Sequence, residues 1–295
     1  MLVIGSRGSQ LALWQARWVQ SQLLAAGIES RIEIIKTTGD KILDVPLAKV
    51  GSKGLFTKEI EDALLDGSVD LAVHSLKDMP TELPDGLTLA AIPEREDVRD
   101  AIIGSTLDAL PQGALVGTSS LRRTAQLRAL RPDLKVESVR GNVDTRLRKL
   151  DEGQYQAIML AAAGLRRLGW ADRIAQYIDP AVMCPAVGQG ALAIETRTDR
   201  TEVAASLEHR DTRIAVTAER ALLGALGGGC QVPIGANATV DGDTVHLRGI
   251  VAAPDGSKVV RGNLSGHAAD AASIGKALAE QLMAQGAQEL LQQVS

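Results

Sequence analysis

Aromatic residues and cysteines are scarce in this chain of 295 residues. Phe, Trp and Tyr make up only 2% of it, so its hydrophobic cores must be built from Leu, Ile, Val and Ala. The two cysteines, Cys184 and Cys230, imply no disulfide framework and fit a reducing compartment. The segment Met1–Arg7 contains no apolar core of a secretion signal. We therefore expect a cytoplasmic protein.

A strong charge of one sign and a long apolar run are also lacking. The formal net charge is −4, so no overall basic field favours a nucleic-acid partner. No apolar run approaches the roughly 20 residues of a membrane helix, so no membrane partner is expected. The four histidines are scattered and no Cys/His pair has ligand spacing, so we expect no metal. Nothing suggests an obligate interface, so we expect a monomer.

The chain does contain short apolar runs that alternate with helical patterns. In its first part, strands are expected at Leu2–Gly5, Arg31–Thr37 and Val69–Val73, and helices near 11–27 and 57–66. Such alternation predicts a parallel α/β sheet, in which ligands bind beyond the carboxyl ends of the strands. Arg7, Lys77 and Asp78 fall at such ends.

A second set of the same kind follows a charged crossover at Pro93–Asp100. Strands are expected at Ala114–Gly117, Lys135–Val139 and Ala157–Ala161, and helices at Leu121–Leu130 and Asn142–Leu150. The apolar run Ala191–Glu195 is expected to return to the first set as a strand. From about Asp211 the pattern predicts a helix near 213–226, antiparallel strands near 236–240, 244–251 and 258–262, and a long helix at Asp270–Gln293.

The expected fold class is therefore α/β, with two α/β domains flanking a cleft and a small C-terminal α+β domain that contains an antiparallel sheet. Domain 1 is expected to comprise residues 1–93 and 190–208. Domain 2 is expected at 97–186 and domain 3 at 211–295.

Basic residues are concentrated between positions 113 and 149, where nine Lys or Arg stand against three acids. The run Thr118, Ser119 and Ser120 is expected to cap a helix whose first turn contains Arg122 and Arg123. Backbone N–H groups, hydroxyls and guanidiniums would then meet at one helix end, which suits an anion. A second such turn is expected at Arg140, with Arg146 one helical turn later. Exposed surface charge is the alternative interpretation of this run.

Two residues could carry covalent or acid–base chemistry. Cys230 follows three glycines, which leave room for a large group on the sulfur, and a thiolate can form a covalent link. A buried, inert thiol is the alternative. Asp78 lies among cations, where a carboxylate can stabilise a developing cation or shuttle a proton. A salt bridge to Lys77 or an arginine is the alternative for Asp78.

The anion is expected to carry carboxylates rather than a triphosphate. The chain has neither the Gly-x-x-x-x-Gly-Lys-Ser/Thr motif of nucleotide phosphate loops nor a Gly-x-Gly-x-x-Gly motif opening a helix. The loop Gly51–Gly54 places a lysine between glycines, which is only a weak signal of phosphate binding and is more often a mobile connection.

Seven stretches taken together resemble the porphobilinogen deaminase family, also called hydroxymethylbilane synthases. In family order they are Ser6–Gln15, Pro46–Phe56, Val73–Pro80, Val116–Arg123, Arg140–Leu147, Pro185–Gly190 and Gly228–Pro233. Each alone is weak, but seven in order across about three quarters of the chain are specific. Residues 198–210 and those after Gly235 match only loosely.

The resemblance implies two periplasmic-binding-protein-like α/β domains with a small α+β domain. It also implies a dipyrromethane cofactor, joined by a thioether to Cys230. Such an enzyme is a transferase of tetrapyrrole biosynthesis, the route to haem and other porphyrins. It condenses four porphobilinogen molecules in turn, releasing ammonia, into the linear tetrapyrrole hydroxymethylbilane.

The family's residue roles carry over to matching positions of this chain. Asp78 is expected to be catalytic, because loss of ammonia leaves a cation that a carboxylate can stabilise. Because porphobilinogen carries two carboxylates, cations and hydroxyls are expected to bind it. The resemblance assigns substrate binding to Arg7, Ser9, Arg140, Arg146 and Arg167, and cofactor binding to Cys230, Lys77, Thr118, Ser119, Ser120, Arg122, Arg123 and Arg146. Cys184 is expected to be a structural thiol, and 49–56 a mobile loop.

Two other function classes remain as alternatives. A solute-binding or effector-sensing module would bind a small anion reversibly and carry no covalent group. A nucleic-acid binder would use the basic run at 113–149 and show salt-dependent binding.

Overall fold

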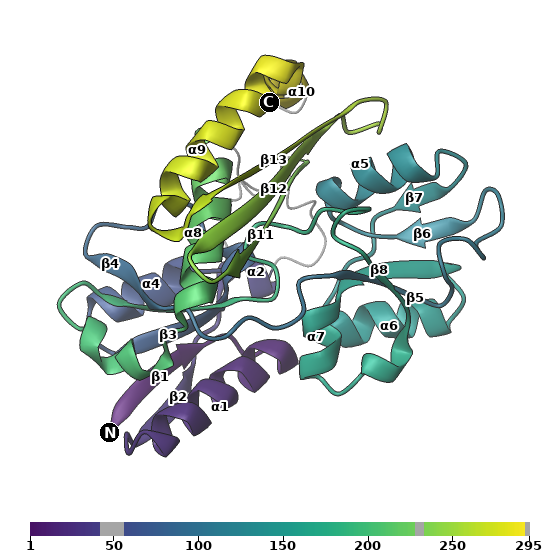
Figure 1. Ribbon diagram of the computed structural model, residues 1–295. Helices are drawn as coiled ribbons and strands as arrows, with labels where there is room; N and C mark the ends of the chain where they lie inside the picture. The colour runs from purple at the N-terminus through teal and green to yellow at the C-terminus, as the bar shows by residue number, and fades with distance from the viewer. Residues whose placement is uncertain (42–55, 228–232, 293–295) are drawn as a thin grey trace. The chain divides into compact units, whose positions relative to one another are not determined.

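The computed structural model describes residues 1–41, 56–227 and 233–292. The chain divides into two compact units (Figure 1). Unit 1 comprises Met1–Glu96 and Ala191–Arg213, and unit 2 comprises Asp97–Gly190 and Ile214–Ser295. None of the helices in the described residues is long and apolar enough to cross a membrane.

Unit 1 contains a five-stranded sheet in the order β2-β1-β3-β10-β4. Its strands are β1 (Leu2–Ser6), β2 (Ser30–Ile34), β3 (Leu71–Ser75), β4 (Leu87–Ala91) and β10 (Leu192–Arg197). Strand β1 runs parallel to β2 and β3, whereas β10 runs antiparallel to β3 and β4. The sheet is therefore mixed, which corrects the expectation of a parallel sheet.

Helices pack on the sheet of unit 1 because alternate residues of β3 face opposite sides. Leu71 and Val73 belong to the core cluster of helix α1 (Gln10–Ala25), whereas Ala72 belongs to that of α4 (Lys58–Leu65). The shorter elements are α2 (Thr38–Lys41) and the 3-10 turns η1 (Leu76–Asp78) and η3 (Thr201–Leu207). The apolar stripes of β3 thus hold a helix on each face, and η1 follows at the carboxyl end.

Unit 2 contains a second mixed sheet, in the order β7-β6-β8-β5-β9. Its strands are β5 (Asp100–Ile103), β6 (Leu115–Gly117), β7 (Lys135–Glu137), β8 (Ala157–Ala161) and β9 (Ile174–Ile178). Strand β6 is parallel to β7 and β8, and β5 is antiparallel to β8 and β9. The helical elements are α5 (Leu121–Leu130), α6 (Val143–Asp151), α7 (Ala162–Arg167) and the turn η2 (Ala171–Arg173). In both sheets the fourth strand in spatial order is the antiparallel one.

The C-terminal part of unit 2 is an antiparallel sheet packed against helices. Strands β11 (Ile234–Asp241), β12 (Thr244–Ala252) and β13 (Val259–His267) pair in sequence order. Figure 1 shows α9 (Ala271–Leu282) against this sheet, where Leu278 and Leu282 share a core with Leu222. Leu222 belongs to α8 (Arg210–Ala225), and the last elements are η4 (Ala268–Asp270), the π-type turn η5 (Met283–Ala287) and α10 (Gln288–Gln292).

The expected α/β class with a small antiparallel C-terminal sheet is confirmed, and β10 pairs with β3 and β4 where a returning strand was expected. The sequence reading missed β4, β5 and β9. The single long helix expected at Asp270–Gln293 is wrong, because Gly286 has a φ of +95° that interrupts it. The separation of 97–186 and 211–295 into two domains stays a prediction.

Candidate active site

Asp78 lies on an exposed turn at the carboxyl end of β3. The Leu76 N–H donates to the Ala191 carbonyl at 3.0 Å, and the Met79 N–H donates to the Leu76 carbonyl at 3.1 Å. Leu76 and Met79 are buried, so the backbone of the turn is fixed while the Asp78 side chain is exposed. Within the part of the chain that the structure describes, Asp78 forms no ion pair. The salt-bridge alternative for Asp78 therefore finds no support there.

The neighbouring strand β1 brings Arg7 and Ser9 to the same edge of the sheet. Because β1 and β3 are adjacent and parallel, with Gly5 opposite Ala72, the residues after both strands leave the same end. The Ser9 hydroxyl accepts the Ala12 N–H at 3.3 Å and caps α1. The Arg7 guanidinium lies over the Phe56 ring, 4.2 Å from its centroid. Unit 1 thus gathers Arg7, Ser9, Lys77 and Asp78 at one edge.

The expected helix cap in unit 2 is confirmed at Ser120. Its hydroxyl accepts the Arg123 N–H at 3.4 Å at the start of α5. The Ser119 hydroxyl donates to the Val139 carbonyl at 2.6 Å, and the Thr118 hydroxyl accepts the Ser120 N–H at 3.2 Å. The three hydroxyls therefore already have partners inside the chain.

Arg122 and Arg123 are buried around a carboxylate of the chain itself. Their exposed fractions are 4% and 6%, and Asp100 between them is fully buried. Arg122 donates to both Asp100 oxygens, at 2.6 and 3.1 Å, and Arg123 Nε donates at 2.9 Å. Exposed surface charge is therefore the wrong interpretation of these two arginines, although it fits Lys135 and Arg148, which are exposed.

Burial by itself would raise the pKa of Asp100, but the two guanidiniums hold it well below its usual range. Asp100 also accepts a hydrogen bond from Gln189 Nε2 at 2.9 Å, and Gln189 Oε1 accepts one from Arg123 at 3.3 Å. The sequence reading missed both Asp100 and Gln189. Asp100 lies before the basic run at 113–149, and its place directly after Arg99 at the end of the crossover is the sequence signal that could have revealed it.

Arg122 also connects this buried group to the start of the C-terminal sheet. It donates to the Cys184 carbonyl at 2.7 Å. A Cβ atom on Gly235 would lie only 2.9 Å from the same carbonyl oxygen, so β11 begins directly against this segment. Cys184 itself is buried, and burial raises the pKa of its thiol to about 12, as expected of a structural thiol.

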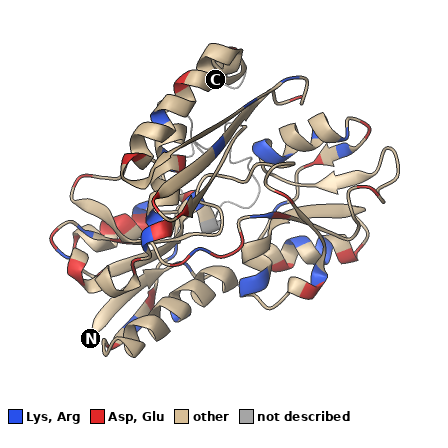
Figure 2. Ribbon diagram, in the orientation of Figure 1, with Lys and Arg blue, Asp and Glu red and all other residues tan. Residues whose placement is uncertain are grey.

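The other predicted arginines of unit 2 lie in the turn after β7 and on the helices α6 and α7. Figure 2 shows Lys and Arg in blue on these helices. Arg146 Nε on α6 donates to the Gly141 carbonyl at 2.8 Å. Arg140 is half-buried just before that glycine. Arg167 is buried at the end of α7 and donates to the Gly190 carbonyl at 2.7 Å. A basic turn therefore follows each of β6 and β7, with Arg167 after β8.

Two predictions fall outside the described residues. Cys230 is one of them, and only its flanking residues Gly227 and Pro233 are described, both in unit 2. The loop expected at 49–56 is described only at Phe56.

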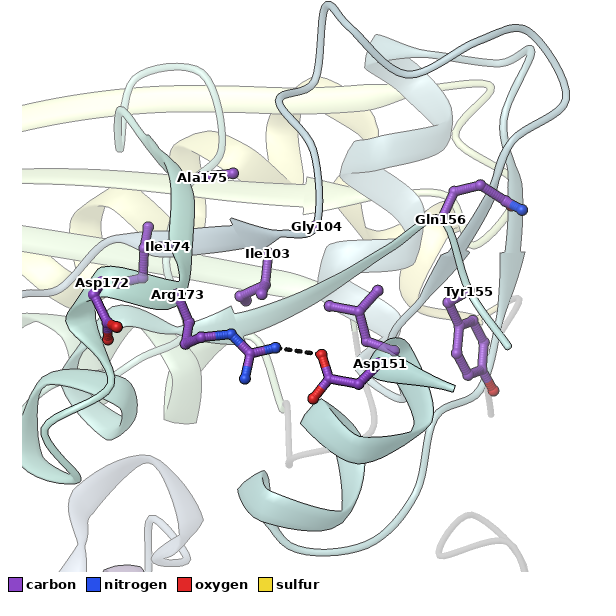
Figure 3. Close-up of a pocket in the computed structure, with 10 residues that line it drawn as sticks. Ile103, Gly104, Asp151, Tyr155, Gln156, Asp172, Arg173, Ile174 and Ala175 are labelled. Atoms are coloured by element: carbon purple, nitrogen blue, oxygen red, sulfur yellow. Dashed lines mark hydrogen bonds and ion pairs between the residues drawn. The ribbon is translucent and has the colours of Figure 1, made fainter. Parts of the chain in front are cut away.

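A surface pocket of about 490 Å³ lies elsewhere in unit 2, beside β5 and β9 (Figure 3). Arg173 and Asp151 form an ion pair of 2.5 Å at its wall. None of the predicted site residues lines it. Among the described residues, no group of three or more His, Cys, Asp or Glu is placed to hold a metal ion.

Two family models match the chain. The dipyromethane cofactor binding domain of porphobilinogen deaminase matches residues 2–205, and the C-terminal domain of the same family matches residues 213–284. The chain belongs to the porphobilinogen deaminase family. Its enzymes are transferases, the hydroxymethylbilane synthases, which condense porphobilinogen into hydroxymethylbilane in tetrapyrrole biosynthesis.

Curated relatives match over nearly their whole length. Porphobilinogen deaminase of Geobacter sulfurreducens is 54% identical over 99% of this chain and 94% of the relative. Those of Nitratidesulfovibrio vulgaris and Syntrophotalea carbinolica are 55% and 56% identical, over 99% and 98% of this chain and 96% and 95% of the relatives. Among solved structures, the methionine binding protein MetQ is similar with a TM-score of 0.44 and 14% identity, over 70% of this chain and 86% of that protein.

Proposed function

We propose that this chain condenses four porphobilinogen molecules into hydroxymethylbilane with Asp78 as its catalytic residue. The observation that carries the proposal is the exposed carboxylate of Asp78, which forms no ion pair with any described residue and lies on a turn whose backbone is fixed by buried neighbours. A group that must respond to charge on a substrate cannot already be neutralised by the protein. Asp78 meets that condition, whereas the buried Asp100 does not.

The reaction gives Asp78 two tasks. When the C–N bond of the substrate's aminomethyl group breaks, the nitrogen leaves as ammonia and the methylene carbon becomes electron-deficient. A carboxylate beside that carbon stabilises the positive charge. When the new C–C bond forms, the attacking pyrrole loses a ring proton, which the same carboxylate can accept. Proton transfer of this kind contributes about 10²–10⁴-fold to a rate.

The substrate's own carboxylates need cations and hydrogen-bond donors. Arg7 and Ser9 leave the same sheet edge as Asp78, so a substrate held by them would have its reactive carbon near that carboxylate. Arg140, Arg146 and Arg167 are the proposed binders in unit 2. Lys77, next to Asp78, is proposed to contact the cofactor.

The residues of unit 2 fit a dipyrromethane group joined to Cys230. Arg122 and Arg123 share the single carboxylate of Asp100, and the buried Nε of Arg122 has no hydrogen-bond partner among the described residues. This buried group therefore has one positive charge more than negative charge, which favours a further anion. When bound, the dipyrromethane supplies the pyrrole end to which substrate units are added.

The position of β11 adds support for that assignment. Gly235 lies against the Cys184 carbonyl to which Arg122 donates, and Cys230 is only five residues earlier in the chain. We propose that carboxylates of a group on Cys230 contact Arg122 and Arg123. We propose Thr118, Ser119, Ser120 and Arg146 as further contacts of the same group.

A cytoplasmic monomer without a nucleic-acid partner completes the proposal. The net charge of −4 supports the absence of a nucleic-acid partner, and the small number of cysteines supports a reducing compartment. The molar mass in solution, measured by light scattering after size-exclusion chromatography, would test the monomeric state directly.

The experiment is the intact mass of the denatured protein with peptide mapping, followed by an assay with porphobilinogen. We expect a covalent excess of two linked pyrrole units on the peptide that contains Cys230, and release of ammonia with formation of hydroxymethylbilane. An unmodified mass that stays unchanged after incubation with porphobilinogen would refute the proposal and favour the reversible anion-binding module.

A further inference from the structure

Gln15 is a buried glutamine in the otherwise apolar face of α1. It is only 2% exposed and lies beside the buried Ala16, Val19 and Leu23 of the same helix. Burying a primary amide is unfavourable unless it is hydrogen-bonded. Gln15 Nε2 donates to the Ser75 hydroxyl at 2.9 Å. Gln15 is the last residue of the stretch Ser6–Gln15, and the sequence predicted no role for it.

Ser75 is the last residue of β3, and the alternation of the strand explains why it meets α1. Leu71 and Val73 pack in the core cluster of α1, and Ser75 continues the same face. The next three residues are the η1 turn that ends at Asp78. The hydrogen bond from Gln15 therefore reaches β3 at the residue from which the Asp78 turn departs.

The N-terminal end of α1 is tied to the turn that contains Arg7 and Ser9. The Ser6 hydroxyl donates to the Ala12 carbonyl at 3.3 Å, and the Ser9 hydroxyl accepts the Ala12 N–H at 3.3 Å. Gln15 lies three residues beyond Ala12, so it follows the first turn of α1 directly. The first turn of α1 thus holds the Arg7–Ser9 segment, and Gln15 connects that helix to the Asp78 turn.

We propose that Gln15 is a positioning residue that sets Arg7 and Ser9 relative to Asp78. The inference rests on the proposed roles of these three residues. An apolar side chain of similar size would fill the same space, but it would leave the end of β3 without the directional contact that a hydrogen bond supplies. A misplacement of about 1 Å at a reacting centre can reduce a rate about 10²-fold.

The test compares Gln15→Met with Gln20→Met. Gln20 is another glutamine of α1, and its Nε2 donates to the Ser30 carbonyl at 2.7 Å. Ser30 is the first residue of β2, so this contact lies at the end of the sheet opposite to Asp78. Both variants lose one hydrogen bond donated by a glutamine Nε2 of the same helix, to a hydroxyl in Gln15→Met and to a backbone carbonyl in Gln20→Met. The value of kcat is calculated per molecule that carries the cofactor, and intact mass gives the fraction of such molecules. We expect this kcat to fall about 10-fold in Gln15→Met and to stay within about twofold of the parent in Gln20→Met. Equal kcat values in the two variants would overturn the proposal.

A double-variant cycle with Ser75→Ala keeps the test decisive if Gln15→Met is unstable. If the contact is what matters, Gln15→Met with Ser75→Ala is no slower than the slower single variant. Independent losses that multiply would contradict the proposal, as would a Ser75→Ala variant with unchanged kcat. Asp78→Asn, measured in parallel, separates the two claims: normal turnover there refutes the proposed function, whereas its loss with equal Gln15→Met and Gln20→Met values refutes only the role of Gln15.

Discussion

Asp78 in unit 1 and Asp100 in unit 2 are aspartates in contrasting surroundings. Asp78 is exposed and has no ion-pair partner among the described residues. Asp100 is fully buried and accepts hydrogen bonds from Arg122, Arg123 and Gln189. The same functional group is thus left exposed in one unit and is paired with arginines inside the other. Burial and partners, rather than residue type, distinguish the carboxylate that we propose as catalytic from the one that orients two arginines.

The cations around the two carboxylates also differ. In unit 2 the arginines predicted to bind a ligand first hold Asp100, which orients both guanidiniums and leaves one excess positive charge. In unit 1, the Arg7 guanidinium stacks on the Phe56 ring. Arg7 forms no ion pair with Asp78. Unit 2 is therefore suited to hold an anion firmly, and unit 1 to let a carboxylate respond to a developing cation.

Replacing Asp78 gives the largest expected effect on the comparison. Asp78→Asn keeps the size of the side chain and removes its charge, so turnover should fall about 10²–10⁴-fold. The melting temperature should change little, because no described ion pair is lost. Asp85→Asn, another exposed aspartate seven residues later, is the control and should retain turnover.

Replacing Asp100 should have the opposite profile, a loss of stability first. Asp100→Asn leaves two buried guanidiniums without their carboxylate, and breaking a buried pair costs about 3–5 kcal/mol. Urea unfolding measures this. Because the pKa of Asp100 is lowered by folding, its contribution is present above the ordinary aspartate pKa of about 3.9 and is lost as the pH falls below it. The variant should lack that part of the acid dependence, and an unchanged acid profile would contradict the assignment.

Replacing Arg122 tests the proposed role of unit 2 in holding the cofactor. In Arg122→Gln one charge-assisted contact to the cofactor is lost, at about 1.5–3 kcal/mol, while Arg123 still neutralises Asp100. We expect a smaller cofactor-bearing fraction by intact mass. Arg148→Gln, an exposed arginine of the same basic run, should load normally. Full loading of the Arg122 variant would count against its role.

The smallest expected effect concerns Glu61, a buried carboxyl of α4 in unit 1. Burial raises the pKa of Glu61 from its ordinary 4.5, and the neighbouring Glu195 adds to the rise, whereas Thr57 and His74 oppose it. The stability that Glu61 contributes is therefore present below pH 4.5 and is lost as the pH rises through the folded-state pKa. Glu61→Gln should gain stability relative to the parent as the pH rises from 4 to 7. A constant difference in unfolding free energy over that range would refute this.

Local sequence patterns predicted those site residues whose position is set by their neighbours in the sequence. Ser120 caps α5 as expected, and Asp78 follows β3 as expected, because caps and strand ends are set by neighbouring residues. Asp100 was missed because its partner Arg122 is 22 positions away in the sequence. The two residues meet only after β5 has paired with β8. Gln15 was missed for the same reason, since its partner is sixty positions away.

The central claim is that Asp78 is the reactive carboxylate and Asp100 the organising one. Its most direct test is the rate of ammonia release from porphobilinogen by Asp78→Asn molecules whose mass shows the cofactor in place. We expect full loading and folding, with a rate of ammonia release reduced by at least about 10²-fold. A rate close to that of the parent protein in fully loaded Asp78→Asn would contradict it.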